Sequence, residues 1–245
     1  MSDLPTLHVL IPCGGTGSRA GAGLPKQYRV LAGRTVLGHT LAAMREVRGI
    51  RSVLVVIAAG DLRGQEQLQE WLAGDPAATE ASFLIAEVAG QTRRDTVFNG
   101  LKWLRQNGAS AQDWVLVHDA ARCLVTAEQV QLLIDACRDD AVGGLLAVPL
   151  PDTLKRAQGG RSTGTLDRAD KWLAQTPQMF RLQALQDALA MAEADVTDEA
   201  SAVEQAGGQP RLVPGSAQNF KLTYPDDFVL AENLLLARQR ERGIR

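Results

Sequence analysis

The stretch LIPCGGTGSRAGAGLPKQY, residues 10–28, ends an apolar run and continues with closely spaced glycines, a proline and two cationic side chains. The apolar residues Leu7–Pro12 predict a buried β-strand, and the glycines predict a loop directly after it. Such a loop offers backbone N–H groups to an anion, and Arg19 and Lys26 add positive charge to it. The stretch therefore predicts a phosphate-binding loop at the end of a strand.

Other kinds of glycine loop fit the stretch less well. Gly15, Gly17 and Ala20 satisfy the G-x-G-x-x-G/A pattern of Rossmann oxidoreductases, but there a helix begins inside the pattern and an acidic residue ends the second strand. Here further glycines and a proline delay the helix, and no G-K-[ST] follows as in a Walker A loop. A mobile loop without function is the remaining alternative. The pattern favours a nucleotidyltransferase loop that wraps a triphosphate.

Apolar runs and segments of helical period alternate along the rest of the chain. This alternation predicts an α/β fold, a Rossmann-like, doubly wound and mostly parallel sheet covered by helices on both faces. We expect residues 1–245 to form a single nucleotidyltransferase domain. The expected strands after the first are Val53–Ala58, Phe83–Val88, Trp114–His118 and 141–150, and the expected helices are Thr35–Val47, Gln129–Arg138, Arg181–Ala194 and Asp226–Arg240.

Residues 151–175 interrupt this alternation. Two short β-compatible pieces, DTLKRA and STGTLDRA, flank QGGR, and the pair Gly159-Gly160 predicts a hairpin. An isolated hairpin is marginally stable in water, so we expect a second copy of the chain to cover this arm. The sequence thus predicts a homodimer through arm exchange. Further on, VTDEAS reads as a polar turn and NFKLT as a strand-like segment.

Composition narrows the class of protein. The chain of 245 residues has a formal net charge of −2 without long runs of like charge, which argues against nucleic-acid binding. The three cysteines lack the spacing of a zinc site or a disulfide framework, and we expect a reducing cytosol. We see neither a signal peptide nor a transmembrane span, and therefore expect a cytoplasmic protein without membrane partners.

A series of motifs resembles one enzyme family. PCGGTGSR and LPKQY are similar to the nucleotide-loop signatures of the 2-C-methyl-D-erythritol 4-phosphate cytidylyltransferases. GQTRRDTV, VHDAAR, PDTLKR, LDRADKW, QTPQMF, VTDEASAVE and NFKLTYPDD follow in the order of the family, so the resemblance spans Val9 to about Glu232. The chain departs from the family at Cys13 and Gly14, which replace alanines, at Gln91, which replaces an acidic residue, and at Cys123, which replaces a proline.

The resemblance implies an activity. A member of this family transfers CMP from CTP to 2-C-methyl-D-erythritol 4-phosphate and releases pyrophosphate, a step of non-mevalonate isoprenoid synthesis. A cytidylyltransferase acting on ribitol 5-phosphate stays an alternative, because both acceptors are polyol phosphates. A nucleotide-binding regulator without catalysis is the other alternative, suggested by Gln91 and Cys123, although the retained cations weigh against it.

The resemblance also implies roles for individual residues. Arg19 and Lys26 are the expected catalytic residues, and Arg168 and Lys221 are expected to position the acceptor phosphate. Asp119, which ends a buried strand where α/β folds place ligands, is expected to bind the acceptor, together with Arg122, Thr153, Thr176 and Thr197. The expected nucleotide-binding residues are Pro12, Cys13, Gly14, Gly15, Thr16, Gly17, Gly90, Gln91, Arg93, Thr96 and Ala120.

No cluster of His or Asp suggests a metal site made by the protein. We expect Mg²⁺ to be held mainly by the CTP phosphates and by water, because Mg²⁺ seldom receives a cage made only of protein ligands. His118 precedes Asp119, and strand alternation points it to the opposite face. We therefore expect His118 to be a core residue.

Overall fold

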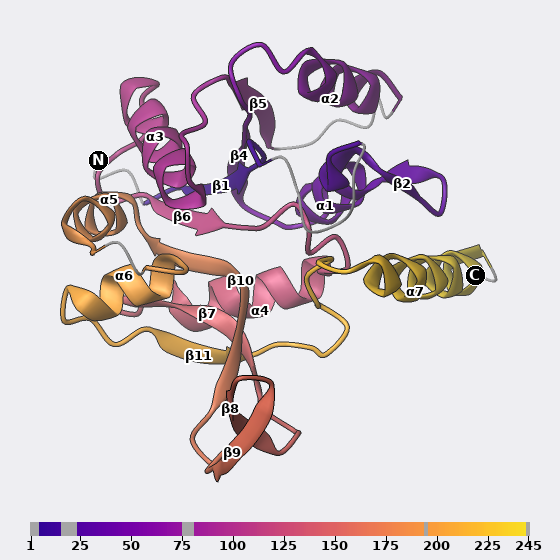
Figure 1. The fold of residues 1–245 in the computed structure, drawn as a ribbon. Coiled ribbons are helices and arrows are strands. Elements are labelled where there is room, and N and C mark those ends of the chain that lie inside the picture. Colours follow the sequence, from indigo (N-terminus) through magenta and orange to yellow (C-terminus); the bar gives the residue numbers. More distant parts are fainter. Residues whose placement is uncertain (1–4, 16–23, 75–80, 194–195, 244–245) are drawn as a thin grey trace.

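A seven-stranded sheet forms the centre of the computed structural model, which describes residues 5–15, 24–74, 81–193 and 196–243 (Figure 1). The sheet strands are β1 (Leu7–Pro12), β4 (Ile50–Val56), β5 (Ser82–Ala86), β6 (Trp114–Val117), β7 (Gly143–Pro149), β10 (Trp172–Arg181) and β11 (Arg211–Pro214). The longer helices are α1 (Val36–Arg45), α2 (Leu62–Gly74), α3 (Arg93–Gln106), α4 (Ala127–Cys137), α5 (Leu182–Met191), α6 (Glu199–Gln205) and α7 (Pro225–Gly243). A short 3₁₀ helix, η2 (Lys26–Tyr28), precedes a small pair of strands, β2 (Val30–Leu31) and β3 (Arg34–Thr35).

Helices cover both faces of the sheet, which explains why its strands are almost continuously apolar. In β1, Val9 and Ile11 pack with α1, α2 and α4, whereas Leu10 packs with α3, α5 and α6 on the other face. α7 packs separately through Phe228 and Leu235. The expected α/β fold with a mostly parallel sheet is confirmed.

Strand order places a crevice at the end of β1. The order is β11-β7-β10-β6-β1-β4-β5, and every neighbouring pair is parallel except those of β10, which is antiparallel to both β6 and β7. From β1 the chain first moves outward to β4 and β5 and then returns to β6 on the other side. In open α/β sheets, ligands bind outside the carboxyl ends of the strands at such a switch point.

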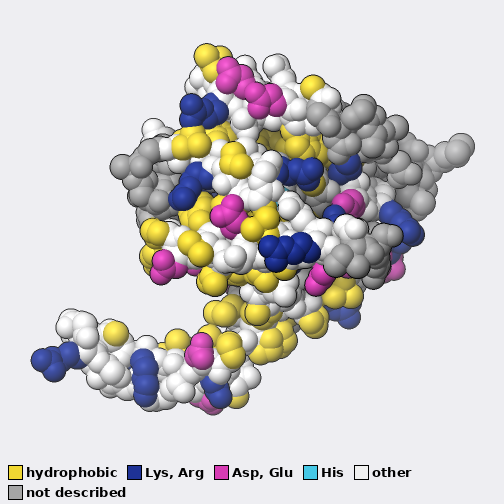
Figure 2. Space-filling model, turned by 90° about the vertical axis from the view of Figure 1, so that its right-hand side faces the viewer, with side chains coloured by type: hydrophobic (Ala, Val, Ile, Leu, Met, Phe, Trp, Pro, Cys, Tyr) yellow, Lys and Arg dark blue, Asp and Glu magenta, His cyan; other side chains and the backbone are white. Residues whose placement is uncertain are grey.

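The arm is an antiparallel hairpin that leaves the sheet between β7 and β10 (Figure 1). Its strands are β8 (Leu154–Gln158) and β9 (Arg161–Leu166), joined by Gly159 and Gly160, whose φ angles of 55° and 74° favour glycine. The predicted hairpin is confirmed. Figure 2 shows the arm projecting from the body, with hydrophobic side chains gathered where it joins.

Two local expectations differ from the structure, and the strands β10 and β11 were not expected. The segment NFKLT, residues 219–223, forms no strand: its backbone bonds go to loops and side chains, such as Leu222 N–H to the Ala121 carbonyl (2.9 Å), and not to a neighbouring strand. VTDEAS is only partly a turn, since Asp198 caps α6 and the helix begins at Glu199. β11, which the sequence did not predict as a strand, pairs in parallel with β7.

Candidate active site

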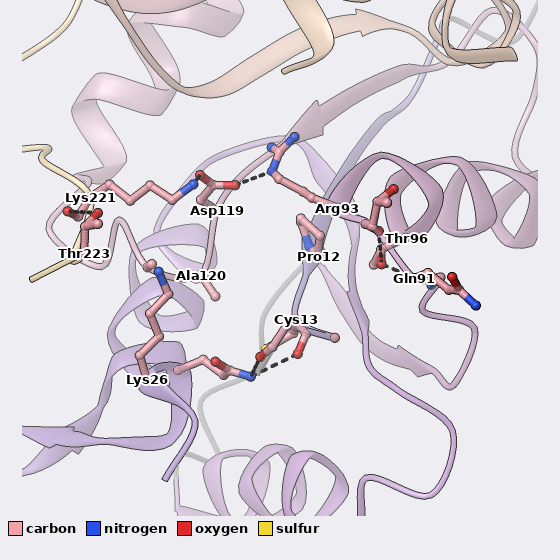
Figure 3. A pocket seen from close by; sticks show the side chains of 16 residues that line it. Pro12, Cys13, Lys26, Gln91, Arg93, Thr96, Asp119, Ala120, Lys221 and Thr223 are labelled. Atoms are coloured by element: carbon pink, nitrogen blue, oxygen red, sulfur yellow. Dashed lines mark hydrogen bonds and ion pairs between the residues drawn. The ribbon is translucent and has the colours of Figure 1, made fainter. Parts of the chain in front are cut away.

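A cavity of about 430 Å³ opens at the carboxyl end of β1. Its walls come from the glycine loop, η2, the start of α3, the turn after β6 and the segment before α7. The predicted residues that line it are Pro12, Cys13, Gly14, Gly15, Lys26, Gly90, Gln91, Arg93, Thr96, Asp119, Ala120 and Lys221, joined by Gln27, Thr92, Ala121 and Thr223 (Figure 3). Segments far apart in the sequence therefore meet at the switch point of the sheet.

The start of the glycine loop forms one wall and is tightly held. Cys13 N–H donates to the Val56 carbonyl (2.8 Å), which extends the pairing of β1 and β4 by one residue. Burial raises the pKa of the Cys13 thiol to about 12, so this cysteine is an inert packing group. A methyl group at Gly14 would overlap the Cβ of Ala89. The wall is therefore close-packed, and it leaves no room for a side chain at Gly14.

Charged side chains cross the cavity in a row. Lys221 Nζ lies 2.7 Å from Oδ2 of Asp119, and Arg93 Nε donates to Oδ1 of the same carboxylate at 2.8 Å (Figure 3). The other two nitrogens of Arg93 donate to both oxygens of the buried Glu199, at 2.6 and 3.0 Å. The row Glu199–Arg93–Asp119–Lys221 alternates in sign and is neutral as a whole.

The pKa values of this row follow from its geometry. Burial alone would raise the pKa of Asp119, but the charges of Arg93 and Lys221 outweigh burial and hold that pKa far below its ordinary value. Burial would lower the pKa of Arg93, and the charges of Asp119 and Glu199 raise it instead. Both groups are therefore ionised throughout the physiological pH range, as buried partners must be.

Lys26 enters the cavity from the other side. It lies on η2 (Figure 3), and its ammonium donates at 3.0 Å to the carbonyl of Leu222, the residue after Lys221. Two cations from opposite ends of the sequence thus face the same space. An anion that binds between them would meet positive charge from both sides.

The start of α3 forms a wall of backbone and small side chains. Thr92 and Asp95 form a reciprocal capping box, and the Thr96 hydroxyl accepts from Gly90 N–H at 3.1 Å. A side chain on Gly90 would collide with Asp95. Gln91 is exposed at the rim. Apart from Arg93, whose charge is paired, the lining residues of this wall are uncharged, which suits a neutral heterocycle better than a phosphate.

The remaining predicted residues lie elsewhere. Arg122 donates to the Asn219 and Ala174 carbonyls (2.7 and 3.1 Å), and the buried Thr176 hydroxyl accepts from Asp119 N–H at 3.0 Å, so both brace the cavity from behind. Thr197 lines a neighbouring cavity that also contacts Arg93. Thr153 and Arg168 are exposed on the arm, where Arg168 donates to the Pro151 carbonyl. Thr16, Gly17 and Arg19 lie outside the described residues.

His118 is buried as expected. Its Nδ1 lies 3.1 Å from the Thr176 hydroxyl, and burial lowers its pKa to about 4. Sequence reasoning missed Glu199 and Gln27. Both stood inside quoted motifs, VTDEASAVE and LPKQY, but nothing in one sequence shows that Glu199 contacts Arg93 across 106 residues.

The described part of the chain shows neither a cluster of metal ligands nor a membrane-spanning helix. It contains no group of three or more His, Cys, Asp or Glu residues arranged to hold a metal ion. None of its helices is both long enough and apolar enough to cross a membrane.

A profile of the family described as IspD, 2-C-methyl-D-erythritol 4-phosphate cytidylyltransferase, matches residues 7–237. The chain belongs to this family. It is therefore a cytidylyltransferase, as the resemblance predicted, and neither alternative function is needed to explain its motifs. The fold agrees, because a solved structure of a 4-diphosphocytidyl-2C-methyl-D-erythritol synthase, 38% identical, superimposes with a TM-score of 0.81 over 94% of this chain and 99% of that one.

Curated relatives agree with the family assignment. The 2-C-methyl-D-erythritol 4-phosphate cytidylyltransferase of Burkholderia vietnamiensis is 47% identical over 95% of this chain and 97% of its own length. A bifunctional IspD/IspF enzyme of Albidiferax ferrireducens is 57% identical over 96% of this chain. The chain spans about half of that bifunctional relative, 54% of its length.

Proposed function

We propose that the cavity at the end of β1 is where CMP passes from CTP to 2-C-methyl-D-erythritol 4-phosphate, with release of pyrophosphate and formation of CDP-methylerythritol. The observation that carries this proposal is the meeting of Lys26 with the row Arg93–Asp119–Lys221 around one space. The reaction brings two phosphate anions together, so cations on both sides of the cavity match its main difficulty. The product would supply non-mevalonate isoprenoid synthesis.

The chemistry needs positioning more than it needs a reactive side chain. A phosphate oxygen of the acceptor forms a new bond to the α-phosphorus of CTP, while the bond from this phosphorus to the bridging oxygen breaks and pyrophosphate leaves with the electron pair. Lys26 and Arg19 neutralise the charge that grows on the α-phosphate. Backbone N–H groups of residues 14–17, with Pro12 and Cys13 beside them, bind the triphosphate, and Gly90–Thr96 with Ala120 bind the cytosine.

The acceptor lies beside Asp119 in this proposal. Both carboxylate oxygens of Asp119 are already paired, so an incoming phosphate competes for Lys221, whose side chain is 40% exposed. When Lys221 turns toward the acceptor phosphate, Arg93 still donates to Asp119, so this buried carboxylate keeps a charged partner. The family resemblance implies that the hydroxyls of Thr153, Thr176 and Thr197 bind the acceptor. Arg122 would be an accessory contact.

Magnesium fits this cavity as a companion of CTP. Asp119 is the cavity's carboxylate, and both of its oxygens are held by cations, so the lining residues suit an ion coordinated by phosphates and water. When bound, the ion would neutralise charge on the triphosphate. The residues of the cavity would orient the phosphates that coordinate the ion.

The arm completes the site of a second subunit in our proposal. Trp172 and Leu173, where β10 leaves the body, are exposed apolar side chains, and the strands of the hairpin have no other layer against them in the described chain. A two-fold pair in which each arm covers the other chain would bury them. Arg168 and Thr153 would then reach the partner's acceptor site, well away from their own.

We place the protein in the cytosol. Its three cysteines are free and buried, as expected for a protein that works without disulfides.

Pyrophosphate release tests the proposed reaction. CTP is offered with methylerythritol phosphate and with ribitol 5-phosphate in turn, and we expect the higher kcat/KM with methylerythritol phosphate. A preference for ribitol 5-phosphate would reject the acceptor, and no turnover with either would favour the regulator. UTP in place of CTP tests the base, since a pocket relaxed by Gln91 would accept both.

Replacing Lys26 tests its role. Lys26→Ala should lower kcat by about 10²- to 10³-fold, the usual effect of losing one group that stabilises a developing oxyanion. The KM for methylerythritol phosphate should change little, because Lys26 acts on the CTP phosphate. Lys102→Ala, an exposed lysine on α3, is the matched control. A change confined to KM would assign Lys26 to binding.

A further inference from the structure

The side-chain amide of Gln27 is buried between two segments of the site. Gln27 lies on η2 next to Lys26, lines the cavity and is only 6% exposed. Its Nε2 donates to the Cys13 carbonyl at 3.1 Å and to the Gly15 carbonyl at 3.0 Å. An amide nitrogen carries two hydrogens, so both donors are used on the wall of the cavity.

These two bonds orient the backbone of the loop. In a planar trans peptide the N–H points opposite to the carbonyl. Because the Cys13 carbonyl is turned toward Gln27, the N–H of Gly14 points away from Gln27. Gly14 and Gly15 both line the cavity, and neither carries a side chain that would screen its backbone. Gln27 therefore controls which backbone groups of this wall are offered to a ligand.

The same bonds tie together the two ends of the glycine loop. Gly15 stands at its beginning and Gln27 just past its end, twelve positions later. Lys26 precedes Gln27 directly, so the position of its side chain relative to the loop wall depends on this tie. The Tyr28 hydroxyl, which lies beside the Cys13 thiol, donates to Asp61 at 2.6 Å and attaches η2 to the body.

We propose that Gln27 is a positioning residue for the triphosphate, which fixes the backbone of Cys13–Gly15 and the catalytic Lys26 in one arrangement. The inference rests on the proposed function, since it assumes that the triphosphate lies between this wall and Lys26. It assigns Gln27 no contact with the reacting atoms. Its effect should therefore appear in CTP binding and in kcat, and not in the KM for the acceptor.

The test replaces Gln27 by methionine, which keeps the length of the side chain and removes both donors. Calorimetry on the full-length protein should show a Kd for CTP raised about tenfold or more, as expected when two hydrogen bonds that organise a site are lost. The KM for methylerythritol phosphate should stay within about twofold of the wild-type value. A wild-type protein that does not bind CTP would contradict the proposed function. Wild-type binding matched by Gln27→Met would contradict this inference alone.

Ser52→Ala is the matched control. It removes one buried hydrogen bond, to His8, near the amino end of β4 and away from the cavity. We expect its Tm to fall while its Kd for CTP stays near that of the wild type. If both variants weaken CTP binding in proportion to their loss of Tm, Gln27 has only a structural role and the inference is wrong.

Gln27→Glu gives a second readout if the methionine variant does not fold. A carboxylate has no donor for the two carbonyls, whereas the protonated acid has one. The ratio of variant to wild-type kcat/KM for CTP should therefore rise as the pH falls toward the ordinary carboxyl pKa of about 4.3. A ratio that does not change with pH would mean that the donors of Gln27 are not needed.

Discussion

At the scale of single residues, Gly14 and Ala89 share one small space at the wall of the cavity. An alanine at Gly14 would overlap the Cβ of Ala89, which explains why this chain departs from the alanine usual in its family. Ala89 is itself fixed, since its N–H donates to the Ile57 carbonyl at 3.0 Å. The effect of a substitution at Gly14 should therefore depend on the residue at position 89.

Exchanging the pair tests this interpretation. Gly14→Ala should lower the free energy of unfolding by about 1 to 3 kcal/mol, the usual cost of overpacking a well-packed site. Ala89→Gly in the same chain should recover most of that loss, because it removes the methyl group that is in the way. Denaturant unfolding of both single variants and of the double variant measures the coupling. Strictly additive losses would show that the two residues do not compete for space.

Residue-level prediction from sequence succeeded where a residue's place in an element decided its position. Asp119 ends a strand, and the glycines follow one, so both were expected at the carboxyl edge of the sheet. Glu199 and Gln27 act through contacts with Arg93 and with loop carbonyls. Those contacts depend on how helices dock against the sheet, and no local pattern in one sequence records that docking.

At the scale of elements, most strands and helices follow from their hydrophobic period. α1 and α4 begin after threonine caps, and β4, β6 and β7 are apolar because both of their faces are covered. The sequence did not predict β10 as a strand, because WLAQTPQMFR mixes polar side chains and a proline with its apolar residues. Its antiparallel pairing with β6 and β7 is visible only in the structure.

Arm exchange is a prediction about the element formed by β8 and β9. We expect the Lys26→Ala chain and the Arg168→Ala chain each to be inactive alone. The two chains are then mixed. If subunits exchange at random, half of the dimers are mixed, and each mixed dimer has one site with both residues intact. Activity should then recover to roughly a quarter of the wild-type value per site.

The opposite arrangement has a different outcome in the same mixture. An arm that served its own subunit would leave one defect in every site. The mixture would then show only the residual rates of its two parents. The size of the recovered activity therefore decides which subunit each arm completes.

At the scale of the whole molecule, stability should fall in mild acid. Burial lowers the pKa of all three histidines, His8, His39 and His118, below the ordinary value of 6.5. Below pH 6.5 these histidines bind protons more readily in the unfolded chain than in the folded chain. The contribution of the histidines to the free energy of unfolding is therefore complete above that pH and is lost as the pH falls. For His118, with a pKa of about 4, the loss amounts to about 3 kcal/mol.

Unfolding by denaturant between pH 7 and pH 4 measures this loss. We expect the free energy of unfolding to decrease steadily over that range, before the carboxylates with lowered pKa values, such as Asp119, add their own loss at lower pH. His118→Gln should flatten the slope, because it removes the residue with the largest shift. An unchanged slope would show that folding does not lower the pKa of His118.

The reversed strand β10 has a consequence for the continuity of the chain. A single cut between Gly159 and Gly160, at the exposed tip of the arm, would divide the molecule into residues 1–159 and 160–245. The sheet strands of the two pieces alternate, because β10 lies between β6 and β7, and β11 lies outside β7. The backbone hydrogen bonds between those strands would hold the two pieces together. A nicked molecule should thus stay together as two interleaved polypeptides and separate only on unfolding.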